Sequence, residues 1–169
     1  MRIRPYSEGG DYEYLEKWDS DERTHALWCA NLIPWPMTKD SFRSLLERNA
    51  KEWMDNAYVA TQEDGEPLGF FCYSFNVENK EGFLKFIIVD EGKRRCGYGR
   101  EMLELALQFA FENTGAETVR LNVFEENEIA RRCYEKVGFA VQSMEEDVFA
   151  YRNERWSRCR MKVCRDKRE

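Results

Sequence analysis

The sequence lacks several features that define whole classes of protein. It has one histidine, and its six cysteines show no Cys-x-x-Cys spacing, so we expect no metal site. No stretch approaches the ~20 apolar residues of a membrane span. Residues 1–5 also lack the apolar region of a signal peptide. We therefore expect a reduced, cytoplasmic protein that does not act at a membrane.

The charge balance argues against nucleic acid as a partner. The 169 residues carry a net charge of -6, and general affinity for nucleic acid needs an excess of basic residues. Residues 155–169 are the exception, with seven Lys or Arg against two acids. We interpret this run as the solvated side of a terminal strand. The length fits one domain, 1–169, without repeats or linkers.

The hydrophobic pattern predicts an α/β fold with a largely antiparallel sheet and a βαβα centre. Helical periodicity is clearest over residues 98–112, and Gly115 is expected to terminate this helix. A second helix is predicted between Asn127, which can cap its start, and Gly138, which can terminate it. Thr38 can cap a helix through about Asn49, after a break at Trp35-Pro36 in a mostly helical region, 11–50. The predicted strands are 2–6, 58–60, 67–77, 83–90, 118–124, 139–151 and 155–164.

A glycine turn between the strand 83–90 and the helix 98–112 is a candidate phosphate site. The motif is Arg94-x-x-Gly97-x-Gly99, and the first N–H groups of a helix are free to bind an anion. Tyr98-Gly99 stands where a nucleotide-triphosphatase loop has Lys-Ser or Lys-Thr, and Met102 replaces the third glycine of a dinucleotide fingerprint. Both motifs are therefore excluded. A tight turn whose glycines serve only packing is the alternative interpretation.

A second motif runs from Asn127 through Ala130 and Tyr134 to Gly138-Phe139. Ala130 and Tyr134 are four residues apart and so share one helix face. A small residue at 130 permits close approach to the helix, and Tyr134 places a phenol beside whatever lies there. The alternative is an ordinary capped helix with a half-buried tyrosine.

The two motifs together resemble the GNAT family of acetyl-CoA-dependent N-acetyltransferases. Their order and spacing agree with the family over residues 83–140, and the chain looks closest to the ribosomal-protein alanine acetyltransferase branch. The resemblance implies a mixed, mostly antiparallel sheet of six to seven strands flanked by helices, with a βαβα acyl-CoA-binding core. Arg95 stands where the family often has glycine, and Cys96 where it often has a basic or small residue.

The resemblance also implies an acetyl-CoA site made largely of backbone groups. The pyrophosphate would lie on N–H groups of the turn and helix start, with Arg94 as a counter-charge. Pantetheine would run along the strand that ends in Ile88-Val89, and the Val89 N–H would polarise the thioester carbonyl. Tyr134 would act as general acid for the departing thiolate. The implied cofactor-binding residues are Ile88, Val89, Arg94, Arg95, Cys96, Gly97, Tyr98, Gly99, Arg100, Asn127, Ala130 and Tyr134.

The expected reaction is direct attack of a primary amine on the thioester in a ternary complex. A cysteine relay through Cys96 or Cys133 is the alternative, but neither has a histidine near it in sequence. Many family members have a glutamate on the strand that corresponds to 83–89, whereas this strand has only Lys85 as a charged residue. The candidate bases lie elsewhere: Glu126 or His25 first, and Glu22 or Asp21 as further options.

We expect the acceptor to be a small-molecule or peptide amine. A lysine amine of pKa ~10.4 costs about 4.6 kcal/mol to deprotonate at pH 7, against about 1.4 kcal/mol for an α-amine of pKa ~8. With no evident base, a peptide α-amine is the easier substrate. Trp18, Trp28, Trp35 and Trp53 are candidates either for an acceptor pocket or for packing of the helices. A non-catalytic acyl-CoA-binding or sensor domain is the alternative function, and we expect a monomer or homodimer.

Overall fold

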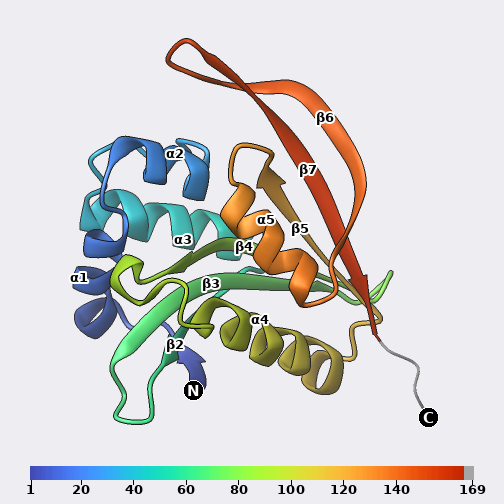
Figure 1. The fold of residues 1–169 in the computed structure, drawn as a ribbon. Coiled ribbons are helices and arrows are strands. Elements are labelled where there is room, and N and C mark those ends of the chain that lie inside the picture. The colour runs from blue at the N-terminus through green and yellow to red at the C-terminus, as the bar shows by residue number, and fades with distance from the viewer. Residues whose placement is uncertain (166–169) are drawn as a thin grey trace.

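The computed structural model describes residues 1–165, which form a seven-stranded sheet with helices on both faces (Figure 1). The strand order is β1-β2-β3-β4-β5-β7-β6. The strands are β1 (Arg2–Pro5), β2 (Asn56–Thr61), β3 (Pro67–Asn76), β4 (Glu81–Val89), β5 (Thr118–Phe124), β6 (Ala140–Tyr151) and β7 (Glu154–Cys164). The α-helices are α1 (Glu8–Trp18), α2 (Glu22–Cys29), α3 (Lys39–Trp53), α4 (Tyr98–Gln108) and α5 (Glu128–Lys136).

Every neighbouring pair of strands is antiparallel except β4 and β5, which run parallel. The final hairpin joins the sheet through its second strand. β7 lies between β5 and β6, so β6 forms the edge of the sheet. Figure 1 shows this hairpin, in orange and red, extending beyond the other strands and past α2.

Two hydrophobic cores lie on opposite faces of the sheet. Successive side chains of a strand point to opposite faces, so Phe71 and Tyr73 of β3 enter one core and Phe70 and Cys72 the other. The first core is covered by α4, through its buried face that includes Leu103, and by α5. The second is covered by α1, α2 and α3.

A third, smaller cluster joins α2 to the final hairpin. Ala26 of α2 packs with Phe124, Tyr151 and Trp156, which come from β5, β6 and β7. Arg23 stacks over the Trp156 ring at 5.1 Å from its centroid, a cation–π contact. α2 is thereby held above the ends of β5 and β7.

The predicted elements are confirmed, with differences at their ends. Thr38 caps α3 with a capping box, and Gly115 ends the helical segment with φ 77°. The segment predicted as one helix over 98–112 is α4 followed by a π-helix, Phe109–Thr114, which periodicity does not reveal. Within residues 1–165 no helix is both long enough and apolar enough to cross a membrane. Part of the basic run, residues 166–169, lies outside the described residues.

Candidate functional site

The central strands β4 and β5 separate part-way along their length. Their ladder joins Glu81–Leu84 to Thr118–Leu121, while the strands continue to Val89 and Phe124. β4 also carries a bulge against β3 at Phe86, whose φ is 51°. A bulge adds one residue and changes the direction of its strand. Within the described chain, the β5 side of residues 86–89 therefore has no strand partner.

The Val89 N–H points toward this open side. The next N–H group, that of Asp90, donates to the Leu68 carbonyl oxygen at 2.8 Å and so points toward β3. Successive N–H groups of a strand point to opposite edges. The end of β4 thus offers a backbone donor at the place where a group lying between the two strands would meet it.

The turn after β4 leads directly into α4. The Asp90 carboxylate accepts a hydrogen bond from the Gly92 N–H at 2.9 Å, and Arg95 and Gly97 have φ values of 65° and 86°. Gly97 is the N-cap of α4 and has no side chain with which to cap it, so the N–H groups of the first turn remain available. The positive φ at Arg95 costs ~1–2 kcal/mol relative to glycine, which explains why glycine suits that position.

The side chains of this turn are mostly exposed, and several are basic. Arg94 lies 3.7 Å from Glu91, a loose contact that leaves the guanidinium exposed. Glu91 in turn accepts a hydrogen bond from Ser20 at 3.0 Å, which ties the turn to the connection between α1 and α2. The free N–H groups and the guanidinium together form an anion-binding surface.

α5 lies beside this helix start. A Cβ added to Gly99 would lie 3.7 Å from both Cys133 Sγ and Val89 Cγ2, so α4, α5 and the end of β4 meet there. Asn127 caps α5, and its Oδ1 accepts from the Ala130 N–H at 3.3 Å. The two sequence motifs therefore form one site. Its backbone groups lie on β4 and α4, and its side chains lie on α5.

Tyr134 is buried on the face of α5 that packs against the core. Its ring contacts Phe139 edge-on, with 6.1 Å between the ring centroids. Burial, with a smaller contribution from Cys133, raises the pKa of the Tyr134 phenol. The phenol therefore keeps its proton at neutral pH, as a general acid must.

His25 is fully buried in α2 and is not placed to act as a base. Its Nδ1 donates to Asp19 at 2.7 Å and its Nε2 to the Ile33 carbonyl at 2.9 Å, so both ring nitrogens carry protons. Burial lowers the pKa of the imidazole, but hydrogen bonds to Asp19, Cys29 and Ile33 outweigh it and raise the pKa to about 10. The prediction of His25 as a base is wrong, because this buried cation holds α1, α2 and the following loop together.

Glu126 lies between β5 and α5, beyond the stretch over which β4 and β5 are paired. Its Oε2 is buried and has no hydrogen-bond partner among residues 1–165. A buried carboxylate oxygen without a partner is costly, so it marks a place where a partner is expected. The pKa of Arg23 is raised chiefly by its hydrogen bond to Glu154 and more weakly by the charge of Glu126, so Glu126 lies near α2.

The two further acids are already engaged. Asp21 caps α2 by accepting from the Thr24 N–H at 2.9 Å, and Glu22 pairs with Arg152 of the final hairpin. The four tryptophans differ in burial. Trp18 is buried in the core, whereas Trp35 and Trp53 are exposed. Trp28 is half-buried, and its indole N–H has no acceptor within the described chain.

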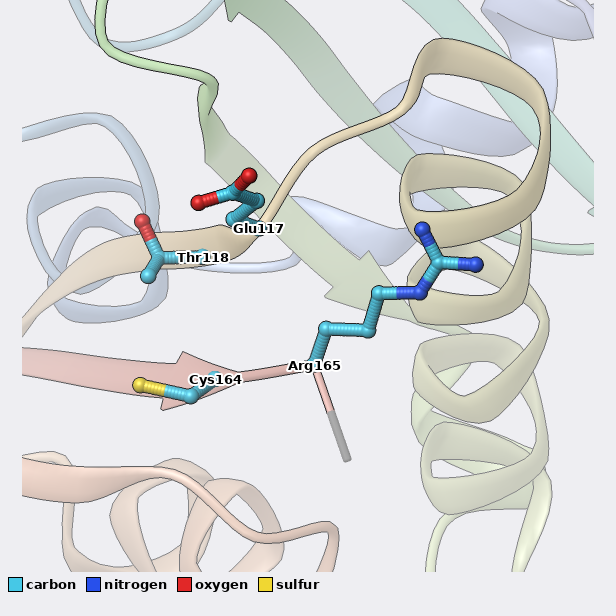
Figure 2. Close-up of a pocket in the computed structure, with 4 residues that line it drawn as sticks. All are labelled: Glu117, Thr118, Cys164 and Arg165. Carbon is cyan, nitrogen blue, oxygen red and sulfur yellow. The ribbon is translucent and has the colours of Figure 1, made fainter. Parts of the chain in front are cut away.

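A hollow of about 400 Å³ lies elsewhere, at the start of β5 and the end of β7. Figure 2 shows its four lining residues, Glu117, Thr118, Cys164 and Arg165. Thr118 and Cys164 are register partners at the end of the sheet opposite Asn127. Residues 1–165 contain no cluster of three or more His, Cys, Asp or Glu side chains that could hold a metal ion.

Sequence reasoning missed two parts of the site. The bulge at Phe86 has no sequence signal, because no glycine or proline marks it. The packing of Arg23 on Trp156 depends on residues more than 130 positions apart. Periodicity placed Trp156 at the start of a strand but could not show that α2 lies over it.

These features define a class of protein, the transferases that hold an acyl-coenzyme A at the opening between two parallel strands. The model of the Acetyltransferase (GNAT) family matches residues 12–139, well over half of the chain, so the chain belongs to that family. It is an N-acetyltransferase that uses acetyl-CoA as co-substrate.

Several known proteins are similar to this chain. The peptidyl-lysine N-acetyltransferase YjaB of Escherichia coli is 30% identical over 131 residues, which cover 76% of this chain and 81% of that protein. The spermine/spermidine N(1)-acetyltransferase of Bacillus subtilis is 30% identical over 97 residues, covering 54% and 64%. The spermidine N-acetyltransferase of Vibrio cholerae, solved with CoA and spermine, superposes with a TM-score of 0.82 at 17% identity, covering 98% and 96%. At this low identity, the superposition shows that the two proteins share a fold.

Proposed function

We propose that acetyl-CoA is held along the open side of β4 and on the first turn of α4. The observation that carries the proposal is the uncapped start of α4 beside the unpaired end of β4. The residues present fit the group. N–H groups at the start of α4 and the exposed Arg94 suit a pyrophosphate, and the β4 edge suits an amide-bearing chain. Asn127 and Ala130 lie on the neighbouring helix, where they would line the same path.

Two groups of this chain would act on the thioester, which supplies an activated acetyl group. The Val89 N–H would donate a hydrogen bond to the carbonyl oxygen, where negative charge develops during attack. Tyr134 would give its proton to the departing sulfur. The phenol is protonated before the reaction, and its burial keeps water away from the departing sulfur.

Glu126 is our proposed base. The unpartnered Oε2 would accept a proton from the acceptor ammonium, or hold that ammonium until it loses the proton to water. The deprotonation argument favours a peptide α-amine as acceptor, which costs less to neutralise than a lysine. The similarity to a peptidyl-lysine acetyltransferase and a spermine/spermidine acetyltransferase supports lysine side chains and polyamines as the competing acceptors.

An acetyl-CoA thiol-release screen tests the function. Peptide α-amines, N-blocked peptides with one lysine, polyamines, amino acids and aminoglycosides would be compared at equal concentration. Thiol release that depends on one amine class is expected. Tight acetyl-CoA binding with no release in any arm would instead identify the alternative, a non-catalytic acyl-CoA sensor. Equal or better turnover of lysine or polyamine substrates would contradict the α-amine preference.

Some expectations remain predictions from the sequence alone. They are a single domain over 1–169, a cytoplasmic location, a monomeric or homodimeric state and membership of the ribosomal-protein alanine acetyltransferase branch.

A further inference from the structure

One face of the sheet beside the proposed acceptor position is basic, although the chain as a whole is acidic. Trp156 of β7 packs beneath α2, and residues two apart on a strand share a face. Arg158, Arg160 and Lys162 therefore line the α2 side of β7. On β5, Phe124 packs in the same cluster, which places Arg120 on that side too.

Strand register brings these side chains together. Arg120 of β5 lies opposite Lys162 of β7, and Asn122 lies opposite Arg160. Phe83 of β4 is the parallel partner of Arg120, and Lys85 lies two residues further along the same side. We call Lys85, Arg120, Arg158, Arg160 and Lys162 the basic face.

The carboxylates that oppose these groups are fewer. Arg120 pairs with Glu81 at 2.6 Å, and Lys85 pairs with the buried Asp55 at 2.9 Å. Glu145 is shared between Arg158 and Arg160. Lys162 has no ion-pair partner within residues 1–165. The five basic groups thus meet three acids, so the face keeps an excess of positive charge on a chain of net charge -6.

The basic face remains open to solvent. The side chains of Arg120 and Arg160 are 45% and 49% exposed. Toward the start of β5 the face runs into the hollow of Figure 2, where Thr118 and Cys164 continue the same side of β5 and β7.

The opposite end of the face reaches the proposed reaction centre. β5 leads through Phe124 to the loop that carries Glu126, and Lys85 precedes the β4 bulge at Phe86. Arg160 lies opposite Asn122, which is four positions back along the chain from Glu126. At a rise of about 3.3 Å per residue this spans up to roughly 13 Å, or three to four residues of an extended peptide.

We infer that the acceptor is an acid-flanked peptide, one whose reactive amine lies three to four residues from a cluster of Asp or Glu side chains. This inference rests on the proposed function and names the substrate class of the same site. The amine would lie at Glu126 and the flanking carboxylates on the basic face. A free polyamine carries positive charge along its whole length, so it would meet like charge at Lys85, Arg120, Arg160 and Lys162.

A set of matched peptides tests this. Each has one acceptor amine and either two Asp, two Gln or two Nε-trimethylated Lys residues (the Lys peptide), whose quaternary nitrogens cannot be acetylated, at the third and fourth positions from it. Spermidine is the fourth substrate. The expected order of kcat/KM is Asp above Gln above Lys, with about tenfold between the first two at low salt. The difference should shrink as salt rises from about 50 to about 300 mM, since the charges are exposed.

Charge reversal identifies the face that is responsible. In the double variant Arg160→Glu with Lys162→Glu, the Lys peptide should become better than the Asp peptide. The control is Arg2→Glu with Arg48→Glu, which makes the same change in net charge at exposed positions of β1 and α3. The control should keep the original order.

Several results would overturn the inference alone: equal kcat/KM for the three peptides, spermidine faster than the Asp peptide, or an inverted order in the control. A changed oligomeric mass in the Arg160 and Lys162 variant would show instead that the basic face binds a second copy of this chain. Inhibition by single-stranded RNA at physiological salt, without a preference among peptides, would assign it to nucleic acid. No thiol release from any substrate would overturn the proposed function and the inference with it.

Discussion

The proposed acetyl-CoA side and the proposed acceptor side of this molecule are built differently. The proposed acetyl-CoA side comes from one continuous stretch, β4 through α5, and the groups that we expect to bind the coenzyme are mainly backbone N–H groups at strand and helix ends. The acceptor side combines α2, β4, β5 and β7, and its groups are side chains brought together by packing. Backbone sites depend on local turn and cap residues, so they can be predicted from sequence. Side-chain sites depend on the tertiary fold.

Replacing Tyr134, the proposed general acid, should give the largest effect, a loss of kcat without a loss of acetyl-CoA binding. In Tyr134→Phe we expect kcat to fall by about 10²–10³-fold, because the thiolate leaves without a proton. The Kd for acetyl-CoA should stay within about twofold, since the backbone groups of β4 and α4 are untouched. Thiol release and calorimetry measure the two quantities. Tyr14→Phe, in α1, is the control, and a similar kcat for both variants would contradict the assignment.

Glu126→Gln probes the acceptor side. We expect kcat/KM to fall about 30-fold at pH 7 and to approach the wild-type value near pH 10, where the amine is neutral without help. Glu125→Gln changes an exposed neighbour and should have no such effect. A loss that stays constant across the pH range would show that Glu126 does not accept the proton.

The buried His25 gives the helices of the acceptor side a pH dependence of their own. Its pKa is raised from 6.5 to about 10, so its stabilising effect is complete below pH 6.5 and is lost as pH rises toward 10. The free energy of unfolding should fall by up to roughly 1.4 kcal/mol per pH unit within that window. NMR can follow the one imidazole directly. Titration near pH 6.5 would contradict the buried cation.

Two glycines of the same turn form a matched pair on the acetyl-CoA side. Gly97 has a positive φ, whereas a Cβ at Gly92 would meet only Asp90 Oδ1, at 3.5 Å. Gly97→Ala should weaken acetyl-CoA binding by about five- to tenfold, because the strained residue shifts the N–H groups. Gly92→Ala should leave the Kd unchanged. Equal changes in Kd for the two variants would show that the positive φ of Gly97 does not determine acetyl-CoA binding.

The smallest expected effect concerns Arg95. Arg95→Gly removes the strain of a positive φ but also makes the unfolded chain more flexible, so the free energy of unfolding should rise by no more than about 1 kcal/mol. Acetyl-CoA binding, measured by calorimetry, should stay within about twofold, because position 95 contributes backbone rather than charge. A Kd weakened more than about tenfold would show that the guanidinium binds the phosphates.

The helices and their caps could be predicted because single residues determine them. Thr38, Asn127 and Gly115 each begin or end a helix where the sequence predicts it. The position of β7 between β5 and β6 could not be predicted, because alternation gives the faces of a strand but not its neighbours.

The same limit applies to the site. Two motifs are recognisable from the sequence, Arg94 through Gly99 and Asn127 through Tyr134. Each is contiguous, and local backbone conformation explains its residue types. The role of His25 could not be predicted, because the Asp19 and Ile33 groups that fix its charge are not implied by spacing. Three members of the basic face lie in the basic run 155–169 that the sequence shows, but its continuation to Arg120 and Lys85 depends on the strand register.

The central claim is that coenzyme A binds at the end of β4 and the start of α4, and backbone amide NMR tests it most directly. When CoA is added to ¹⁵N-labelled protein, the largest shift changes should fall on the amides of Val89, Gly97, Tyr98, Gly99 and Arg100. Changes centred instead on Thr118 and Cys164, at the hollow across the sheet, would contradict the account.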